Sequence, residues 1–240
     1  MSFVVLASRS PRRVELLKQL VADFTVVPAD IDETPHANED PVSYVKRLAL
    51  EKARAVYMVS DSSAIVIGAD TTVDLDGHIF GQPVDDDDAR RMLTLLSGTT
   101  HQVHTGVAVV SATGEQVEVV SSSVTFLDLQ PEMLEWYIGT GESVGKAGSY
   151  AIQGHGSALV ASSSGSMTNI IGLPLEETDT MVFHAGTAWD GQNLTTQGGR
   201  VLCVTALGST VRAAQKQAYV GVQKIAFDGQ QYRRDIGHLA

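Results

Sequence analysis

The chain has 240 residues, enough for one large domain or two small ones with a hydrophobic core that needs no disulfide or structural metal. Hydrophobic residues make up 43% of it and charged residues 19%, which excludes intrinsically disordered, collagen-like and coiled-coil proteins. The formal net charge of -11 argues against a nucleic acid polymer or a membrane surface as partner. It does not exclude a small phosphorylated ligand, which a local cluster of donors and a divalent cation can hold.

The sequence contains no apolar run near the roughly 20 residues of a membrane span, and its start lacks the residue order of a signal peptide. We therefore expect a cytoplasmic protein. The single cysteine, Cys203, has no partner for an internal disulfide, and its apolar neighbours favour a buried structural thiol.

The charge is distributed unevenly along the chain. Residues 1–182 hold 11 basic and 25 acidic residues, a net charge of -14, whereas residues 183–240 hold 6 and 3, a net charge of +3. This composition break predicts two parts, 1–182 and 183–240.

The first part alternates short apolar runs, typical of buried strands, with amphipathic segments typical of helices. In the helix predicted over residues 41–57, we expect Val42 and the other apolar residues to face inward, and the charged residues, Arg47 and Lys52 among them, to cover the rest. The predicted elements are strand 3–7, helix 11–20, strand 24–28, helix 41–57, strand 64–68, hairpin 73–80, helix 85–98, strands 103–110 and 116–127, helix 131–138, strands 151–153 and 157–160, and helix 173–181.

These elements predict an α/β (mixed α+β) fold, with helices on both faces of a twisted mixed sheet. After residue 182 the pattern indicates a small β-β-α segment, with its helix at about 210–225.

The string Ser8-Arg9-Ser10-Pro11-Arg12-Arg13 joins the end of the first strand to the start of the first helix. Backbone N–H groups, hydroxyls and guanidinium groups converge there, which suits a polyphosphate. The same string is also compatible with a capped helix whose arginines are solvated.

Two acidic residues follow predicted strands, where open α/β sheets present ligand-binding groups. Asp70 comes after strand 64–68, and Glu33 lies in the polar segment after strand 24–28. Two converging carboxylates could hold Mg2+, and one of them could deprotonate a water molecule; either residue could instead be a turn former. A zinc site is not expected, because His101 and His104 lie three apart on one strand and so face opposite ways.

Taken in order, seven motifs of residues 3–181 resemble the Maf family. They are Leu6–Arg13 with Glu15-Leu16-Leu17, Ile31–Thr34, Leu48-Ala49 with Glu51-Lys52-Ala53, Gly68–Thr71, Leu96–Gly98, Gly148 with Tyr150–Gly154, and Asn169 with Gly172–Leu175.

This resemblance implies a two-lobed fold around a mixed sheet, a nucleotide in the cleft and a homodimer as assembly. Maf proteins are nucleoside triphosphate pyrophosphatases, which release a nucleoside monophosphate and pyrophosphate. The Ser-Pro-Arg-Arg string and the Tyr-x-Ile-Gln-Gly string resemble the branch that acts on dTTP and UTP. Some members are described as septum-formation inhibitors, so a nucleotide-binding regulatory protein with weak turnover is the alternative.

The resemblance also implies roles for single residues. Asp70 is the expected general base and, with Glu33, the expected ligand of Mg2+, Mn2+ or another divalent cation. One departure concerns Gln82, because the family usually has a phosphate-facing lysine there; either turnover is reduced or the neighbouring arginines compensate. Phosphate contacts are implied for Ser8, Arg12, Arg13 and Lys52, and base selection for Arg12, Thr71 and Gln153.

The segment after residue 182 resembles the C-terminal domain of phosphoribosylamine-glycine ligase. The parts of that ligase that bind ATP have no counterpart in the sequence, so no ligase activity is expected. A protein whose tail recruits purine-synthesis enzymes is a third hypothesis, favoured by the tail alone.

Overall fold

The structure is a computed structural model that describes residues 3–175, 181–184, 187–189, 194–196, 202–206, 211–223 and 232. Contacts divide the chain into two compact units, Met1–Pro174 and Leu175–Ala240. The boundary after residue 182, which rests on composition, stays a prediction. Within the described residues, no helix has the length and apolar character needed to cross a bilayer.

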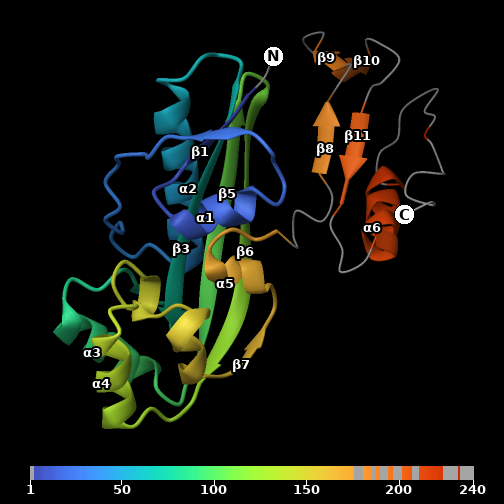
Figure 1. Ribbon diagram of the computed structural model, residues 1–240. Coiled ribbons are helices and arrows are strands. Elements are labelled where there is room, and N and C mark those ends of the chain that lie inside the picture. Colours follow the sequence, from blue (N-terminus) through green and yellow to red (C-terminus); the bar gives the residue numbers. More distant parts are fainter. Residues whose placement is uncertain are drawn as a thin grey trace. The chain divides into compact units, whose positions relative to one another are not determined.

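The first unit is built on a seven-stranded mixed sheet in the order β2-β1-β3-β5-β6-β7, with β4 paired to β3 (Figure 1). Strand β1 runs parallel to β2 and β3, and the other pairs are antiparallel. The predicted α/β class is therefore confirmed. The strands are β1 (Phe3–Ala7), β2 (Phe24–Val26), β3 (Ala64–Leu75), β4 (His78–Phe80), β5 (Thr100–Ser111), β6 (Gly114–Phe126) and β7 (Val160–Ser164).

Strand β3 is longer than the sequence indicated. It does not stop at Gly68 but continues to Leu75, because residues beyond Gly68 pair with β5. Its parallel neighbour β1 ends at Ala7, opposite Gly68. Asp70 thus lies within a strand and not in the loop that the sequence predicted. The end of β1 leaves room beside this part of β3.

One face of the sheet is covered by helix α2 (Pro41–Tyr57), which begins at its N-cap Asp40. The helix approaches the strands at two glycines. A Cβ atom on Gly68 would lie 2.3 Å from the carbonyl oxygen of Ala49, and one on Gly106 would lie 2.3 Å from that of Val45. Backbone therefore packs on backbone, which fixes the position of α2 along β3 and β5.

The buried stripe of α2 differs from the prediction at two residues. Val42 is 40% exposed, whereas Lys52 is buried. The stripe repeats with the helical period and passes through position 52 but not 42, so spacing and not side-chain polarity decides which residues face the sheet. The buried positions are Pro41, Tyr44, Val45, Leu48, Ala49, Lys52, Ala53 and Val56.

The remaining helices of the first unit are α1, α3, α4 and α5. Helices α3 and α4 lie together beside one end of the long strands (Figure 1). They share a hydrophobic cluster that includes Leu93, Phe126 and Tyr137, whereas a separate cluster that includes Val5 and Ala53 lies under α2. The unit therefore has two lobes. The bounds are α1 (Pro11–Leu17), α3 (Asp86–Leu96), α4 (Pro131–Gly139) and α5 (Met167–Ile171), with short 3-10 helices η1 (Ala147–Ser149) and η2 (Gly154–Leu159).

The two strands predicted at 151–153 and 157–160 are wrong. Residues 151–153 form no strand, and η2 occupies most of the segment predicted as strand 157–160. The helix predicted at 173–181 is absent from residues 173–175, and position 181 begins a strand; residues 176–180 lie outside the described residues. Before this segment lies α5, a helix that the sequence did not indicate; Ser166 caps its start and Gly172, at φ 125°, ends it.

In the second unit the described elements are four short strands and one helix. Strand β8 (Met181–His184) pairs with β11 (Leu202–Thr205), and β9 (Thr187–Trp189) pairs with β10 (Leu194–Thr196). The helix predicted at about 210–225 is α6 (Val211–Gln223). Cys203 lies in β11 opposite Phe183, and the burial of its side chain lies outside the description.

The contact between α2 and the glycines can be tested by adding one methyl group. We expect Gly68→Ala to lower the free energy of unfolding by about 1–3 kcal/mol, since the new Cβ meets backbone that cannot turn away. Gly139→Ala is the matched control, because a Cβ there meets nothing within 4 Å. Urea denaturation of both variants measures the difference, and equal stabilities would contradict the packing argument.

Candidate functional site

A cavity of about 920 Å³ opens in the first unit beside the part of β3 that extends past β1. It is lined by the β1–α1 loop, the β2–α2 loop, α2, β3, the loop after β4 and the segment 142–154. The site residues predicted from the sequence are all among the lining residues: Ser8, Arg12, Arg13, Glu33, Lys52, Asp70, Thr71, Gln82 and Gln153.

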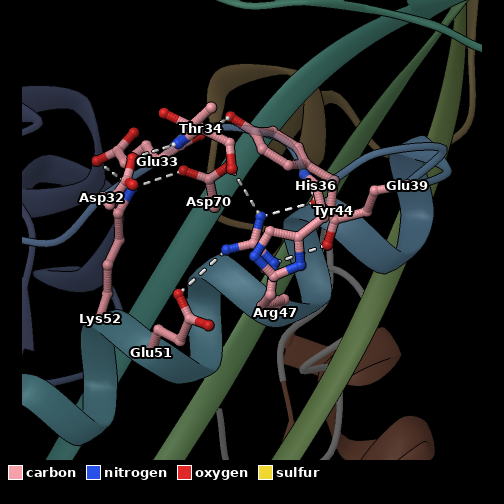
Figure 2. A network of polar contacts seen from close by, with 10 residues as sticks. All are labelled: Asp32, Glu33, Thr34, His36, Glu39, Tyr44, Arg47, Glu51, Lys52 and Asp70. Atoms are coloured by element: carbon pink, nitrogen blue, oxygen red, sulfur yellow. Dashed lines mark hydrogen bonds and ion pairs between the residues drawn. The ribbon is translucent and has the colours of Figure 1, made fainter.

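The centre of the site is a buried ion pair between α2 and β3. Lys52 Nζ lies 2.6 Å from Asp70 Oδ1 and 2.9 Å from Glu33 Oε1 (Figure 2). The side chains of Lys52 and Asp70 are only 10% and 9% exposed, whereas that of Glu33 is 48% exposed. One ammonium group thus holds two carboxylates, one deep and one at the surface.

Burial raises the pKa of the Asp70 carboxyl above its ordinary value of 3.8. The positive charges of Lys52 and Arg13 oppose this shift, and the negative charge of Glu33 adds to it. A carboxylate with a raised pKa is a stronger base than an exposed aspartate. The site therefore holds a buried, basic carboxylate beside a cavity that can contain water.

Arg13 ties three elements together. Its Nε donates a hydrogen bond to the Gly172 carbonyl (2.7 Å), Nη2 donates to Thr71 Oγ1 (2.9 Å), and Nη1 lies 3.5 Å from Ser8 Oγ. Burial lowers the pKa of this guanidinium, and Asp70 opposes that shift. Arg13 is thus partly engaged in holding the site together, although it still lines the cavity.

The hydroxyl of Thr71 has a restricted role. It accepts from Arg13 and shares a 2.9 Å hydrogen bond with Thr105 Oγ1, which itself donates to the Asn169 carbonyl. Because Thr105 has a single hydroxyl hydrogen, Thr71 must be the donor in their bond. Thr71 can therefore offer a ligand only an acceptor.

Arg12 differs from its neighbour. Within the described residues, no side chain or backbone group accepts a hydrogen bond from its guanidinium, and no carboxylate forms an ion pair with it. Burial lowers its pKa, an effect that Tyr137 and Glu142 oppose. A half-buried arginine with free donors that lines a cavity is suited to bind an anion.

The loop that carries Glu33 is fastened to α2. The Tyr44 hydroxyl donates to the Glu33 carbonyl (2.9 Å), and Arg47 binds both carboxylate oxygens of Glu39, each at 2.7 Å. Arg47 also reaches the Thr34 carbonyl and lies over the Tyr44 ring (Figure 2). These contacts hold the Glu33 backbone close to Lys52.

Sequence reasoning missed the roles of Tyr44 and Arg47. It placed Arg47 on the outer face of the helix, but its partner Glu39 precedes the helix and is brought back by the cap at Asp40. The arginine holds the pKa of Glu39 down, at about 2. For Tyr44 the sequence did hold a signal, because its spacing from Val45, Leu48 and Lys52 places it on the buried face of α2.

On the opposite lobe, Glu142 holds the segment that contains Gln153. Its carboxylate accepts hydrogen bonds from the backbone N–H groups of His155 (3.2 Å) and Gly156 (2.7 Å). The hydroxyl of Tyr137 accepts another from the N–H of Ala151 (3.2 Å). Gln153 is thus placed at the cavity by backbone contacts on both sides of it.

Gln82 and Lys146 lie on adjacent loops of the same lobe, and both line the cavity. The N–H of Gly148 donates to the Gly81 carbonyl (3.0 Å), which joins the two loops. Sequence reasoning did not single out Lys146. Its signal was a lysine between glycines, directly before the motif that contains Gln153.

The two histidines of β5 do not line the cavity. His101 Nε2 is hydrogen-bonded to the Tyr150 hydroxyl (2.7 Å). His104 contacts Ser121 Oγ through Nδ1 and Asp74 through Nε2. Within the part of the chain that the structure describes, no group of three or more His, Cys, Asp or Glu side chains is arranged to hold a metal ion.

The carboxylates of Glu33 and Asp70 nevertheless fit Mg2+. Both contact the same ammonium, so they lie close enough to share a cation. Mg2+ commonly takes one or two carboxylates from the protein and completes its shell with water and substrate phosphates. Two carboxylates at a cavity lined by arginine and lysine are a donor set of this kind.

A mixed sheet with a cation-lined cavity at the end of a parallel strand defines an α/β protein whose cavity suits a phosphorylated ligand. The chain belongs to the Maf family: the model of Maf-like proteins matches residues 3–185. The resemblance drawn from the motifs is confirmed.

Curated relatives support the same assignment. The dTTP/UTP pyrophosphatase of Anaeromyxobacter sp. (strain Fw109-5) is 48% identical over 203 residues, which cover 82% of this chain and 97% of the relative. The dTTP/UTP pyrophosphatase of Myxococcus xanthus is 51% identical over 185 residues, which cover 77% and 93%.

The second resemblance is also confirmed, since the C domain of phosphoribosylglycinamide synthetase matches residues 162–239. The matched ranges of the two families share residues 162–185. Among solved structures, the Ham1 protein of Staphylococcus aureus gives a TM-score of 0.41 at 17% identity, covering 53% of this chain and 73% of that protein.

The fastening of the Glu33 loop can be tested through Glu39. We expect Glu39→Gln to lower the free energy of unfolding by about 1.5–3 kcal/mol, because Arg47 loses a charged partner whose side chain is 9% exposed. Glu51→Gln is the control, since Glu51 contacts the same arginine but is 39% exposed. Denaturant titration of both variants provides the comparison, and an equal loss for the two would contradict the argument.

Proposed function

We propose that the protein is a nucleoside triphosphate pyrophosphatase that hydrolyses dTTP and UTP to the monophosphate and pyrophosphate. The observation that carries the proposal is the buried Asp70–Lys52 pair at a cavity lined by Arg12 and Gln153. The names of relatives about half identical to this chain over more than nine-tenths of their length support it.

In the proposed reaction a water molecule attacks at the anhydride between the α- and β-phosphates. Asp70 accepts a proton from the water as the new P–O bond forms. The anhydride P–O bond breaks, and its electron pair leaves with pyrophosphate. Lys52 and Arg12 stabilise the charge that develops on the phosphate oxygens.

A divalent cation fits this scheme. Glu33 and Asp70 would hold Mg2+, or Mn2+ in its place, and the cation would neutralise phosphate charge. Lys52 keeps the two carboxylates together and so prepares the site for a second positive charge.

Base selection is assigned to the lobe that carries Gln153. Its amide offers one donor side and one acceptor side, as the edge of a pyrimidine requires. Arg12 and Thr71 are the other residues proposed to shape this choice. For Thr71 the geometry favours an indirect part, through Arg13, or acceptance of one hydrogen bond. Modified pyrimidine nucleotides are candidate substrates on the same grounds.

The primary test is pyrophosphate release from a panel of triphosphates, with and without Mg2+. We expect Asp70→Asn to lower kcat at least 100-fold, since it removes the proposed base, while binding of dTTP persists. Asp76→Asn is the matched control, because this aspartate lies in the turn after β3 and not at the cavity. Tight binding of dTTP by the unmodified protein without turnover would favour the regulatory alternative.

The raised pKa of Asp70 gives the reaction a pH dependence. The proposed base acts only when deprotonated, so kcat/KM should fall as the pH drops through its pKa. Because kcat/KM refers to the free enzyme, in which burial without a bound cation raises that pKa, the loss should begin at a higher pH than for an aspartate of ordinary pKa 3.8. A pH profile of kcat/KM for dTTP checks this, with circular dichroism to follow folding. An acid limb at or below 3.8 would contradict it.

The homodimer and the cytoplasmic location that the family resemblance implies stay predictions, as does the absence of a nucleic acid or membrane partner. We assign no ligase activity to residues 183–240.

A further inference from the structure

The cavity has a cation that the scheme above does not use. Lys146 is half-buried and lines the cavity on the loop between α4 and η1. Its Nζ donates a hydrogen bond to the Val144 carbonyl (3.1 Å), and within the described residues no carboxylate forms an ion pair with it. An ammonium group with one backbone partner has donors left for a ligand.

Lys146 lies close enough to Arg12 for the two charges to interact. Burial lowers the pKa of Lys146, and the positive charge of Arg12 lowers it further. The carboxylate near both is that of Glu142, whose oxygens accept backbone N–H groups of His155 and Gly156. Two like charges thus share one part of the cavity, an arrangement that a bound anion would stabilise.

The loop of Lys146 is also next to the neutral residue Gln82. The Gly148 N–H bonds to the Gly81 carbonyl, and a Cβ atom on Gly145 would lie 4.0 Å from Gln82 Oε1. A positive charge at position 82 or at position 146 would therefore attract an anion to the same region of the cavity.

We propose that Lys146 is a phosphate-binding residue, which with Arg12 holds the departing pyrophosphate and supplies positive charge beside the neutral side chain of Gln82. This inference rests on the proposed function. Asp70 activates water on the α2 side, and an in-line displacement places the leaving group away from the attacking water. Among the cations that line the cavity, Arg9 and Lys52 are paired with carboxylates, and Arg13 is hydrogen-bonded to the Gly172 carbonyl and the Thr71 hydroxyl. Arg12 and Lys146 are therefore the lining cations left with the most free donors for a ligand.

The test compares charge at position 146. We expect Lys146→Gln to raise both KM for dTTP and the Kd for inorganic pyrophosphate at least tenfold, because one charged hydrogen bond is lost. Lys146→Arg should restore most of both constants. Lys46→Gln is the control, since this lysine is exposed on α2 and does not line the cavity. Thermal unfolding of each variant shows whether it is folded.

Moving the charge gives a second readout that packing alone would not change. In the Lys146→Gln background, Gln82→Lys should recover at least half of the lost pyrophosphate affinity and should raise kcat/KM by a larger factor than it does in the unmodified protein. Unchanged constants in folded Lys146→Gln would overturn the inference, as would a loss that neither arginine nor Gln82→Lys repairs. If the unmodified protein hydrolyses no triphosphate, the proposed function fails, while pyrophosphate binding still decides the role of Lys146.

Discussion

The site depends on the burial of one ion pair, Lys52 with Asp70. Two charges taken out of water cost free energy unless their geometry is good and each finds further partners. Here the helix carrying Lys52 is seated on glycine backbone at Gly68 and Gly106, which brings the ammonium within 2.6 Å of the carboxylate. Glu33 supplies the additional partner. The relative positions of β3, α2 and the Glu33 loop are thus constrained, because the buried ammonium of Lys52 must contact both Asp70 and Glu33.

The two adjacent arginines show how one helical turn divides structure from ligand binding. Successive residues of a helix point about 100° apart, so Arg12 and Arg13 cannot face the same way. Arg13 turns toward Thr71 and Gly172 and joins β3 to the end of α5, whereas Arg12 turns toward the lobe of Tyr137 and Glu142. The guanidinium of Arg13 therefore stabilises the first lobe, and the guanidinium of Arg12 is left to bind an anion.

Local patterns predicted much of this fold, and long-range contacts account for most of the errors. The bounds of β1 and α2 follow from apolar runs and a Pro-containing start, which act within a few residues. The place of Asp70 within β3 depends on pairing with Gly106 of β5, which is distant in the sequence, and no local signal contains it. The site residues predicted from the motifs all line one cavity. Lys146 was missed because its closeness to Arg12 and Gln82 is defined only in the folded chain.

Helix α5 bears on how the two family matches meet. The match to the synthetase C domain begins at residue 162, yet Asn169 is buried in the first unit, where its amide donates to the Val103 carbonyl and to Ser122 Oγ. The carbonyl of Gly172 receives the hydrogen bond from Arg13, and Ile171 lines the cavity. Residues up to Gly172 are therefore structural parts of the Maf-like unit. The match to the synthetase domain includes residues 162–172, but the contacts of these residues lie within the first unit, where they form part of the cavity wall.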